Sequence, residues 1–142
     1  MNILVGYDGS DEAKDALKLA QKHAKASGAK IEVARSVTRH IPLDYEEIQV
    51  AEEDLKWEIG YQLNEEITNY QTRLLVSSNS TGQNLVQMAE IEKSDEIIIG
   101  VRKRSKVGKL LLGSAAQYVI LNASCPVVTI KLHVPRSERR AI

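Results

Sequence analysis

The sequence predicts an α/β domain with an open, five-stranded parallel sheet that carries helices on both faces. Three observations predict this class. Short apolar runs alternate with amphipathic stretches, so that a strand followed by a helix occurs four times before a final strand. The apolar runs suit strands that are buried on both faces, and right-handed crossovers place helices on both sides of such a sheet. The length, 142 residues, fits one domain.

The first strand and helix have clear local signals. The run Ile3–Gly6 is short and partly β-branched, and the turn Asp8-Gly9-Ser10 follows it. Ser10 is a good helix cap, and small apolar residues recur after it at helical spacing. Gly28 is expected to end this helix. Residues 31–37 then contain the apolar positions of a second strand.

A long amphipathic helix is expected after Pro42. One face would carry the apolar side chains of Ile48, Ala51, Leu55, Ile59, Leu63, Ile67 and Tyr70. The segment Asp44–Glu66 also holds nine acidic residues and one basic residue, Lys56. These acidic residues mostly fall on the other face, which we interpret as a solvated surface.

The second half repeats the alternation. The expected elements are a strand over Arg73–Ser77, a short helix with Leu85, Val86, Met88 and Ala89 inward, a strand at Ile97–Ile99, a helix opened by Gly113-Ser114, and a strand over Val127–Lys131 after Pro126. We expect residues 1–133 to form the single domain. The polar, Arg-rich tail 134–142 has little to bury and is expected to be mobile.

Composition excludes several classes of protein. Nineteen basic residues balance nineteen acidic ones, and no apolar run is long enough to span a membrane. The start of the chain lacks a basic leader, so we expect a cytoplasmic protein. Cys125 is the single cysteine and the three histidines share no spacing, which argues against disulfides, a metal site and a catalytic triad. Cys125 itself is interpreted as a small buried residue.

Two loops are candidates for a binding site. In the strand order 3-2-1-4-5, the loop after strand one (Tyr7–Ser10) and the loop after strand four (Gly100–Gly113) face each other where the winding reverses, which is where open α/β sheets bind ligands. The second loop contains five basic residues and no acidic one between Arg102 and Lys109. It also places a glycine and a hydroxyl at a helix start, where amides favour phosphate. Alternatively, Asp8 and Gly113-Ser114 serve only as helix starts, and the basic stretch is only a solvated surface.

The second loop also resembles a known motif. Gly100-Val101-Arg102-Lys103, nine further residues to Leu112, and then Gly113-Ser114 are similar to the G-x2-G-x9-G-[ST] nucleotide motif of the universal stress protein family. The later Cys125-Pro126-Val127-Val128 and the early Asp8-Gly9-Ser10 are also similar to that family. The resemblance covers roughly Met1 to Lys131. It implies a Rossmann-like fold, an adenine-nucleotide site and a homodimer.

The resemblance also implies site residues by position. The adenosine side would be lined by Tyr7, Asp8 and Gly9, and the adenine would meet the backbone of Ser36 or Val37. The phosphates would be surrounded by Gly100, Arg102, Gly113, Ser114, Ala115 and Ala116. The middle glycine of the motif is replaced by Lys103, whose side chain either obstructs the approach of phosphate or adds a cation beside it.

We therefore expect a regulatory module in the stress response that binds ATP, AMP or another adenine nucleotide, with Mg²⁺ as a companion of ATP. The alternative is a dimeric protein-interaction module that needs no nucleotide. A slow ATPase is a weaker alternative, because no nucleophile and general base can be paired, and we do not expect an enzyme. The homodimer would form through the fifth strand, protein partners are unknown, and the basic loop lacks the aromatic residues that nucleic-acid binding favours.

Overall fold

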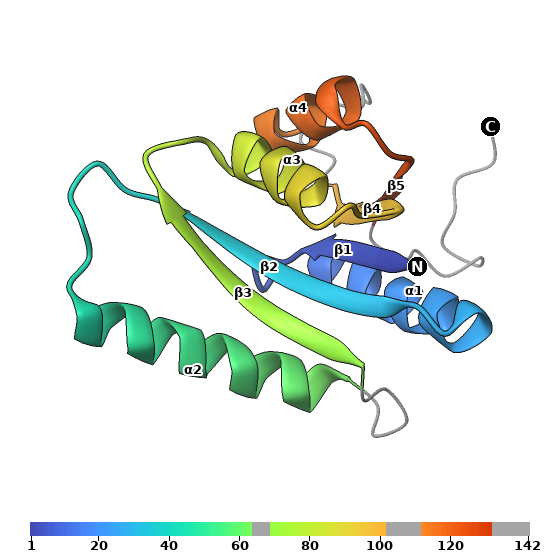
Figure 1. The fold of residues 1–142 in the computed structure, drawn as a ribbon, viewed down its shortest axis with the longest axis horizontal. Helices are drawn as coiled ribbons and strands as arrows, with labels where there is room; N and C mark the ends of the chain where they lie inside the picture. Colours follow the sequence, from blue (N-terminus) through green and yellow to red (C-terminus); the bar gives the residue numbers. More distant parts are fainter. Residues whose placement is uncertain (64–68, 102–111, 132–142) are drawn as a thin grey trace, which may run out of the picture.

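The protein is described here by a computed structural model covering residues 1–63, 69–101 and 112–131. Figure 1 shows a twisted sheet with two helices on each face. In chain order the elements are β1 (Asn2–Gly6), α1 (Asp11–Ser27), β2 (Lys30–Thr38), α2 (Tyr45–Gln62), β3 (Tyr70–Ser77), α3 (Thr81–Ile91), β4 (Glu96–Gly100), α4 (Ser114–Asn122) and β5 (Val127–Ile130).

The sheet has the predicted order β3-β2-β1-β4-β5, and all of its strand pairs are parallel. The predicted fold class is therefore confirmed. Helices α1 and α2 cover one face, and α3 and α4 cover the other (Figure 1). Because β1 and β4 are neighbours at the centre, the carboxyl ends of these two strands meet at the point where the winding reverses.

Side-chain alternation along the central strand separates the core into two layers. Ile3 and Val5 of β1 pack with α1 and with the buried residues of α2, whereas Leu4 points to the layer beneath α3 and α4. All three side chains have no exposed surface. Burial on both faces explains why the strand is a continuous apolar run.

Helix ends follow the predicted chemistry. The Ser10 side chain accepts a hydrogen bond from the Ala13 amide and caps α1, and Gly28 ends it with φ 74° in the left-handed region. Asp44 and Ser80, which the sequence analysis did not single out, form reciprocal capping boxes at the starts of α2 and α3.

The predicted boundary between the second helix and the third strand was wrong. Tyr70, expected on the helix, is the first residue of β3, and the helix ends at Gln62 with Leu63 in extended conformation as its C-cap. The reason is pairing with β2, which begins where Ile31 faces Tyr70 and continues over eight positions. Ile67 lies outside the described residues.

Two further predictions concern the C-terminal end of the chain. β5 ends at Ile130, one residue before the predicted end at Lys131. The tail 134–142 lies outside the described residues. Across the described parts of the chain, no helix is long and apolar enough to cross a membrane, and the cytoplasmic location stays a prediction.

Candidate functional site

A cavity of about 230 Å³ opens at the carboxyl ends of the central strands. The described residues that line it come from all three inner strand ends and from the starts of three helices. They are Gly6, Tyr7, Asp8, Ala13, Ala34, Ser36, Thr81, Leu85, Ile99, Gly100, Ala115 and Ala116. The cavity therefore lies at the switch point of the sheet, where the sequence analysis placed the ligand.

Tyr7 anchors the wall next to β1. Its phenol donates a 2.8 Å hydrogen bond to Oε1 of Glu58 on α2, and the Arg35 guanidinium lies 5.6 Å from the centre of the Tyr7 ring. Arg35 also pairs with Glu58 at 3.5 Å. Burial, and then the hydrogen bond to Glu58, raise the pKa of Tyr7 well above its usual range, so the phenol stays a donor. This cluster fixes the loop after β1 against α2.

The turn after Tyr7 depends on Gly9. Its φ of 84° lies in the left-handed region, and a Cβ there would lie 2.9 Å from a guanidinium nitrogen of Arg35. Within the turn, Asp8 Oδ1 accepts a 2.9 Å hydrogen bond from the Ser10 amide. The glycine thus permits both the turn and the approach of Arg35, while Asp8 itself lies on the exposed rim of the cavity.

A buried amide orients Ser36 at the end of β2. Asn84 of α3 is 6% exposed and donates from Nδ2 to Ser36 Oγ at 2.9 Å. Its Oδ1 accepts a 2.8 Å hydrogen bond from Ser77 of β3. Because both sides of the amide are satisfied, Ser36 is held in one orientation against the cavity.

Gly100 ends β4 where α1 begins. A Cβ at this position would lie 2.5 Å from the backbone carbonyl carbon of Glu12 and 2.7 Å from its oxygen. This close approach between strand and helix explains the glycine without any ligand. Gly113 is different, because a Cβ there would meet nothing within 4 Å among the described residues.

Three helices begin at the cavity, but their first amides differ. Side chains of Ser10 and Ser80 cap α1 and α3, whereas no side chain in the described part of the chain caps α4, whose N-cap is Gly113. Ala115 and Ala116 in its first turn line the cavity. The positive end of the α4 dipole therefore faces the cavity with amides that suit an anion.

Six of the twelve predicted site residues line this one cavity: Tyr7, Asp8, Ser36, Gly100, Ala115 and Ala116. Gly9 and Ser114 are next to lining residues, and Gly113 precedes Ser114 in the same segment. Val37 pairs with Val76 within the sheet and is not among the lining residues described. Arg102 and Lys103 lie outside the described residues.

Sequence reasoning missed six lining residues: Gly6, Ala13, Ala34, Thr81, Leu85 and Ile99. Thr81 and Leu85 come from α3, whose start follows Ser77 at the end of β3. A helix cap directly after a parallel strand marks the same edge of the sheet, so Ser80 was a signal for this third wall.

A model of the universal stress protein family matches residues 1–131. The chain belongs to the universal stress protein family. A universal stress protein of Thermus aquaticus is 34% identical over 137 residues, which cover 91% of this chain and 97% of that protein. Among solved structures, a universal stress protein from Archaeoglobus fulgidus is 35% identical with a TM-score of 0.77, covering 92% of this chain and 98% of that one.

A further solved structure is the universal stress protein from Archaeoglobus fulgidus in complex with dAMP. It is 30% identical to this chain, with a TM-score of 0.73, and covers 92% of this chain and 98% of its own.

Proposed function

We propose that this universal stress protein binds an adenine nucleotide in the cavity at the carboxyl ends of β1, β2 and β4, and acts as a regulatory module in the stress response. The observation that carries the proposal is the meeting of Asp8, Ser36 and the uncapped first turn of α4 around one cavity. The relative from Archaeoglobus fulgidus that was solved with dAMP supports an adenine nucleotide as the ligand.

Each part of the nucleotide has a counterpart in the cavity. The amides of Ala115 and Ala116 would bind phosphate at the positive end of α4. The carboxylate of Asp8, on the rim, would accept hydrogen bonds from the ribose or the base. Of the two candidates at the end of β2, we favour Ser36 over Val37 for the adenine, because Ser36 lines the cavity.

We propose that ATP with Mg²⁺ is the nucleotide form whose binding is strengthened most by the basic segment between Arg102 and Lys109. Asp8 carries the single carboxylate among the described lining residues, and in the complex with ATP it would hold Mg²⁺ together with phosphate oxygens instead of bonding to the ribose or the base. Lys103 can be tested directly with Lys103→Gly. If the lysine contributes a cation, this variant binds ATP more weakly, and if it obstructs the loop, the variant binds ATP more tightly.

Calorimetric titration with AMP, ADP and ATP tests the site. Gly113→Asp should weaken binding by roughly tenfold or more, because an aspartate cap stabilises α4 while it occupies the amides that phosphate needs and repels it. Gly60→Ala on α2 is the matched control, since no described lining residue comes from that helix. Absence of heat with all three nucleotides at millimolar concentration would overturn the proposal.

We propose binding without turnover. Among the described lining residues Asp8 is the single carboxylate and there is no histidine or cysteine, so these residues offer no nucleophile–base pair of the Ser–His or Cys–His kind. Phosphate release from ATP should not exceed the rate without protein. Release that grows with protein concentration and is lost in Asp8→Asn would instead favour the slow ATPase.

The second candidate is a dimeric protein-interaction module that needs no nucleotide. It is favoured by β5, which pairs with β4 on one side and forms the end of the described sheet. Exposed strand edges tend to be covered, and two such edges can pair with twofold symmetry. Sedimentation with and without ATP should give a dimer in both cases, and a monomer at micromolar concentration contradicts this candidate.

A further inference from the structure

Helix α2 has a second apolar stripe on the side that faces away from the sheet. At about 100° per residue, Val50, Trp57 and Tyr61 lie within roughly 40° of one another and on the opposite side of the helix from the buried Leu55. Trp57 is 82% exposed and Tyr61 is 88% exposed. We call these three residues the outer stripe.

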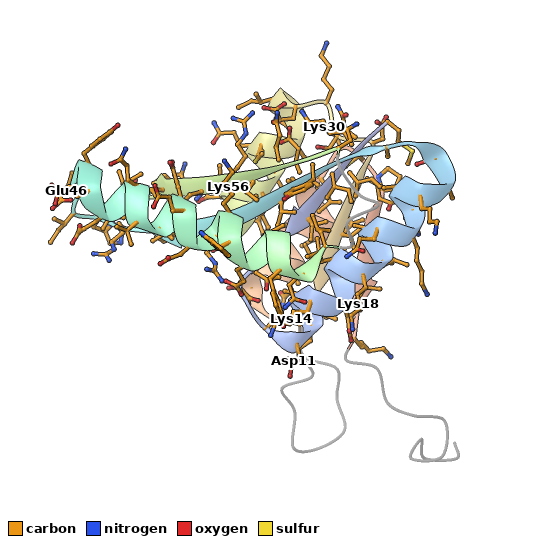
Figure 2. The ribbon with its side chains drawn as sticks, turned by 90° about the horizontal axis from the view of Figure 1, so that it is seen from below. Asp11, Lys14, Lys18, Lys30, Glu46 and Lys56 are labelled. Atoms are coloured by element: carbon orange, nitrogen blue, oxygen red, sulfur yellow. The ribbon has the colours of Figure 1, made fainter. Side chains whose placement is uncertain are left out.

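The outer stripe revises the sequence interpretation of this helix. The face opposite Leu55 and Ile59 was expected to be a solvated acidic surface, but it also carries two of the larger aromatic side chains of the protein. Figure 2 looks onto α1 and α2, with Glu46 and Lys56 labelled on α2. A helix that is apolar on two opposite sides is typically covered on both sides. In α2 the sheet covers only the side with Leu55 and Ile59.

The outer stripe also contains a notch. A shallow cavity of about 360 Å³ is lined by Lys56, Trp57, Gly60 and Tyr61. Gly60 lies inside the helix and is exposed, although glycine is a poor helix former. A Cβ at Gly60 would lie 3.6 Å from the Tyr70 hydroxyl, and without one the surface beside the rings of Trp57 and Tyr61 stays open to a side chain from outside.

The charges around the outer stripe indicate what kind of partner it suits. The outer stripe is flanked by the exposed carboxylates of Glu46, Glu53 and Asp54, and α2 as a whole has six acidic residues and one basic residue. Tryptophan and tyrosine rings attract Arg and Lys cations, and neighbouring carboxylates add to that attraction. A second copy of the same face would instead bring acidic residues against acidic residues.

We propose that the outer stripe of α2 is a docking surface for a basic, amphipathic segment of a partner protein. Apolar residues of that segment would cover Val50 and the two rings and enter the notch over Gly60, whose charged lining residue is Lys56. Its cations would face Glu53 and Asp54. This is recognition of an amphipathic helix by an aromatic surface that is separate from the cavity at the strand ends.

Trp57 is the only tryptophan, so the fluorescence of the full-length protein reports on this surface alone. The probe is a synthetic amphipathic helical peptide with Leu on one face and Lys and Arg on the other. At about 0.15 M salt, where long-range charge effects are screened, its addition should shift the Trp57 emission to shorter wavelength and reach saturation. A peptide with Glu in place of Lys and Arg should leave the emission unchanged.

Matched variants locate the effect on the outer stripe. Tyr61→Ala keeps the reporter and should weaken peptide binding at least about tenfold, as expected for an aromatic anchor. Leu121→Ala on α4 removes a side chain of similar exposure, 81%, and should change nothing. Glu53→Gln should weaken binding, whereas Glu52→Gln, which removes the same charge on a different side of α2, should not.

Three results would overturn the proposal. The first is an emission that does not shift, or that shifts equally with the acidic peptide. The second is a shift that appears on concentrating the protein alone, which assigns the face to a second copy. The third is an emission typical of a buried indole in dilute protein without peptide.

Discussion

Replacing Gly100 by alanine should destabilise the fold, even though the residue belongs to a nucleotide motif. The added Cβ would lie 2.5 Å from the carbonyl carbon of Glu12, which is 0.9 Å short of the 3.4 Å at which ordinary contact begins. Backbone atoms of α1 form two of the three closest contacts, so a side-chain rotation cannot relieve the overlap. Overpacking of this kind typically costs about 1–3 kcal/mol, and we expect a value near the upper end, about 3 kcal/mol.

Urea denaturation followed by circular dichroism measures this loss of unfolding free energy. For a domain of this size, about 3 kcal/mol corresponds to a decrease in melting temperature of roughly 10 °C. Gly113→Ser is the matched control at the other end of the motif, because its Cβ would meet no described residue within 4 Å and serine is a good helix cap. We expect the control to be as stable as the parent or slightly more stable.

The reasoning is refuted if Gly100→Ala unfolds at the same urea concentration as the parent, or if Gly113→Ser is the less stable variant. Either result would mean that β4 and α1 do not approach as closely in solution as in the structure. The expected result would mean that loss of nucleotide binding in a Gly100 variant reports on the fold as well as on ligand contacts.

Three other predictions concern single side chains. Tyr7→Phe removes the hydrogen bond to Glu58 and should lower stability by about 1–3 kcal/mol at neutral pH in urea titrations. Because the pKa of Tyr7 is raised in the folded state, its stabilising effect is complete below pH ~10 and is lost as the pH rises above that value. The difference in unfolding free energy between the parent and Tyr7→Phe should therefore shrink above pH ~10. A constant difference would contradict this prediction. Asn84→Ala leaves Ser36 without its amide partner and should lower the unfolding free energy by about 1–3 kcal/mol in the same assay. It should also weaken nucleotide binding in calorimetry, and unchanged binding would argue against a role for Ser36. Cys125 is half-buried, not fully buried as the sequence predicted. This partial burial still raises the pKa of its thiol, so iodoacetamide should alkylate this single cysteine more slowly than free cysteine at pH 8, and an equal rate would contradict the raised pKa.

The parts of the fold that were predictable are those fixed by local chemistry and by chirality. Ser10 and Gly28 bound α1 through side-chain and backbone preferences that act within a few residues. Right-handed crossovers predicted helices on both faces, and the order 3-2-1-4-5, which was assumed in order to locate the switch point, is the order observed. Tyr70 could not be placed in this way, because its spacing continues the apolar face of α2, and only the pairing with Ile31 in β2 assigns it to a strand.

The candidate site was predictable where it consists of loops at strand ends, and less so where packing decides. Asp8 and Gly100 follow strands that are evident in the sequence. Asn84 gives no local signal of its role, since it is one polar residue in a helix until the fold buries it between Ser36 and Ser77. Trp57 was hidden in the same way, because an acidic helix face does not show which of its apolar residues are left uncovered.

Tyr7 connects the cavity at the strand ends with the helix that carries the outer stripe. The residue lines the cavity proposed to bind the nucleotide, and its hydroxyl is hydrogen-bonded to Glu58, on the helix that also carries Trp57. A ligand that altered this bond would change the affinity of α2 for a partner, and the partner would change the ligand's affinity by the same factor. A single charge-assisted hydrogen bond of about 1–3 kcal/mol limits that factor to roughly 5–150. Coupling that is carried by this one hydrogen bond would therefore stay within that range.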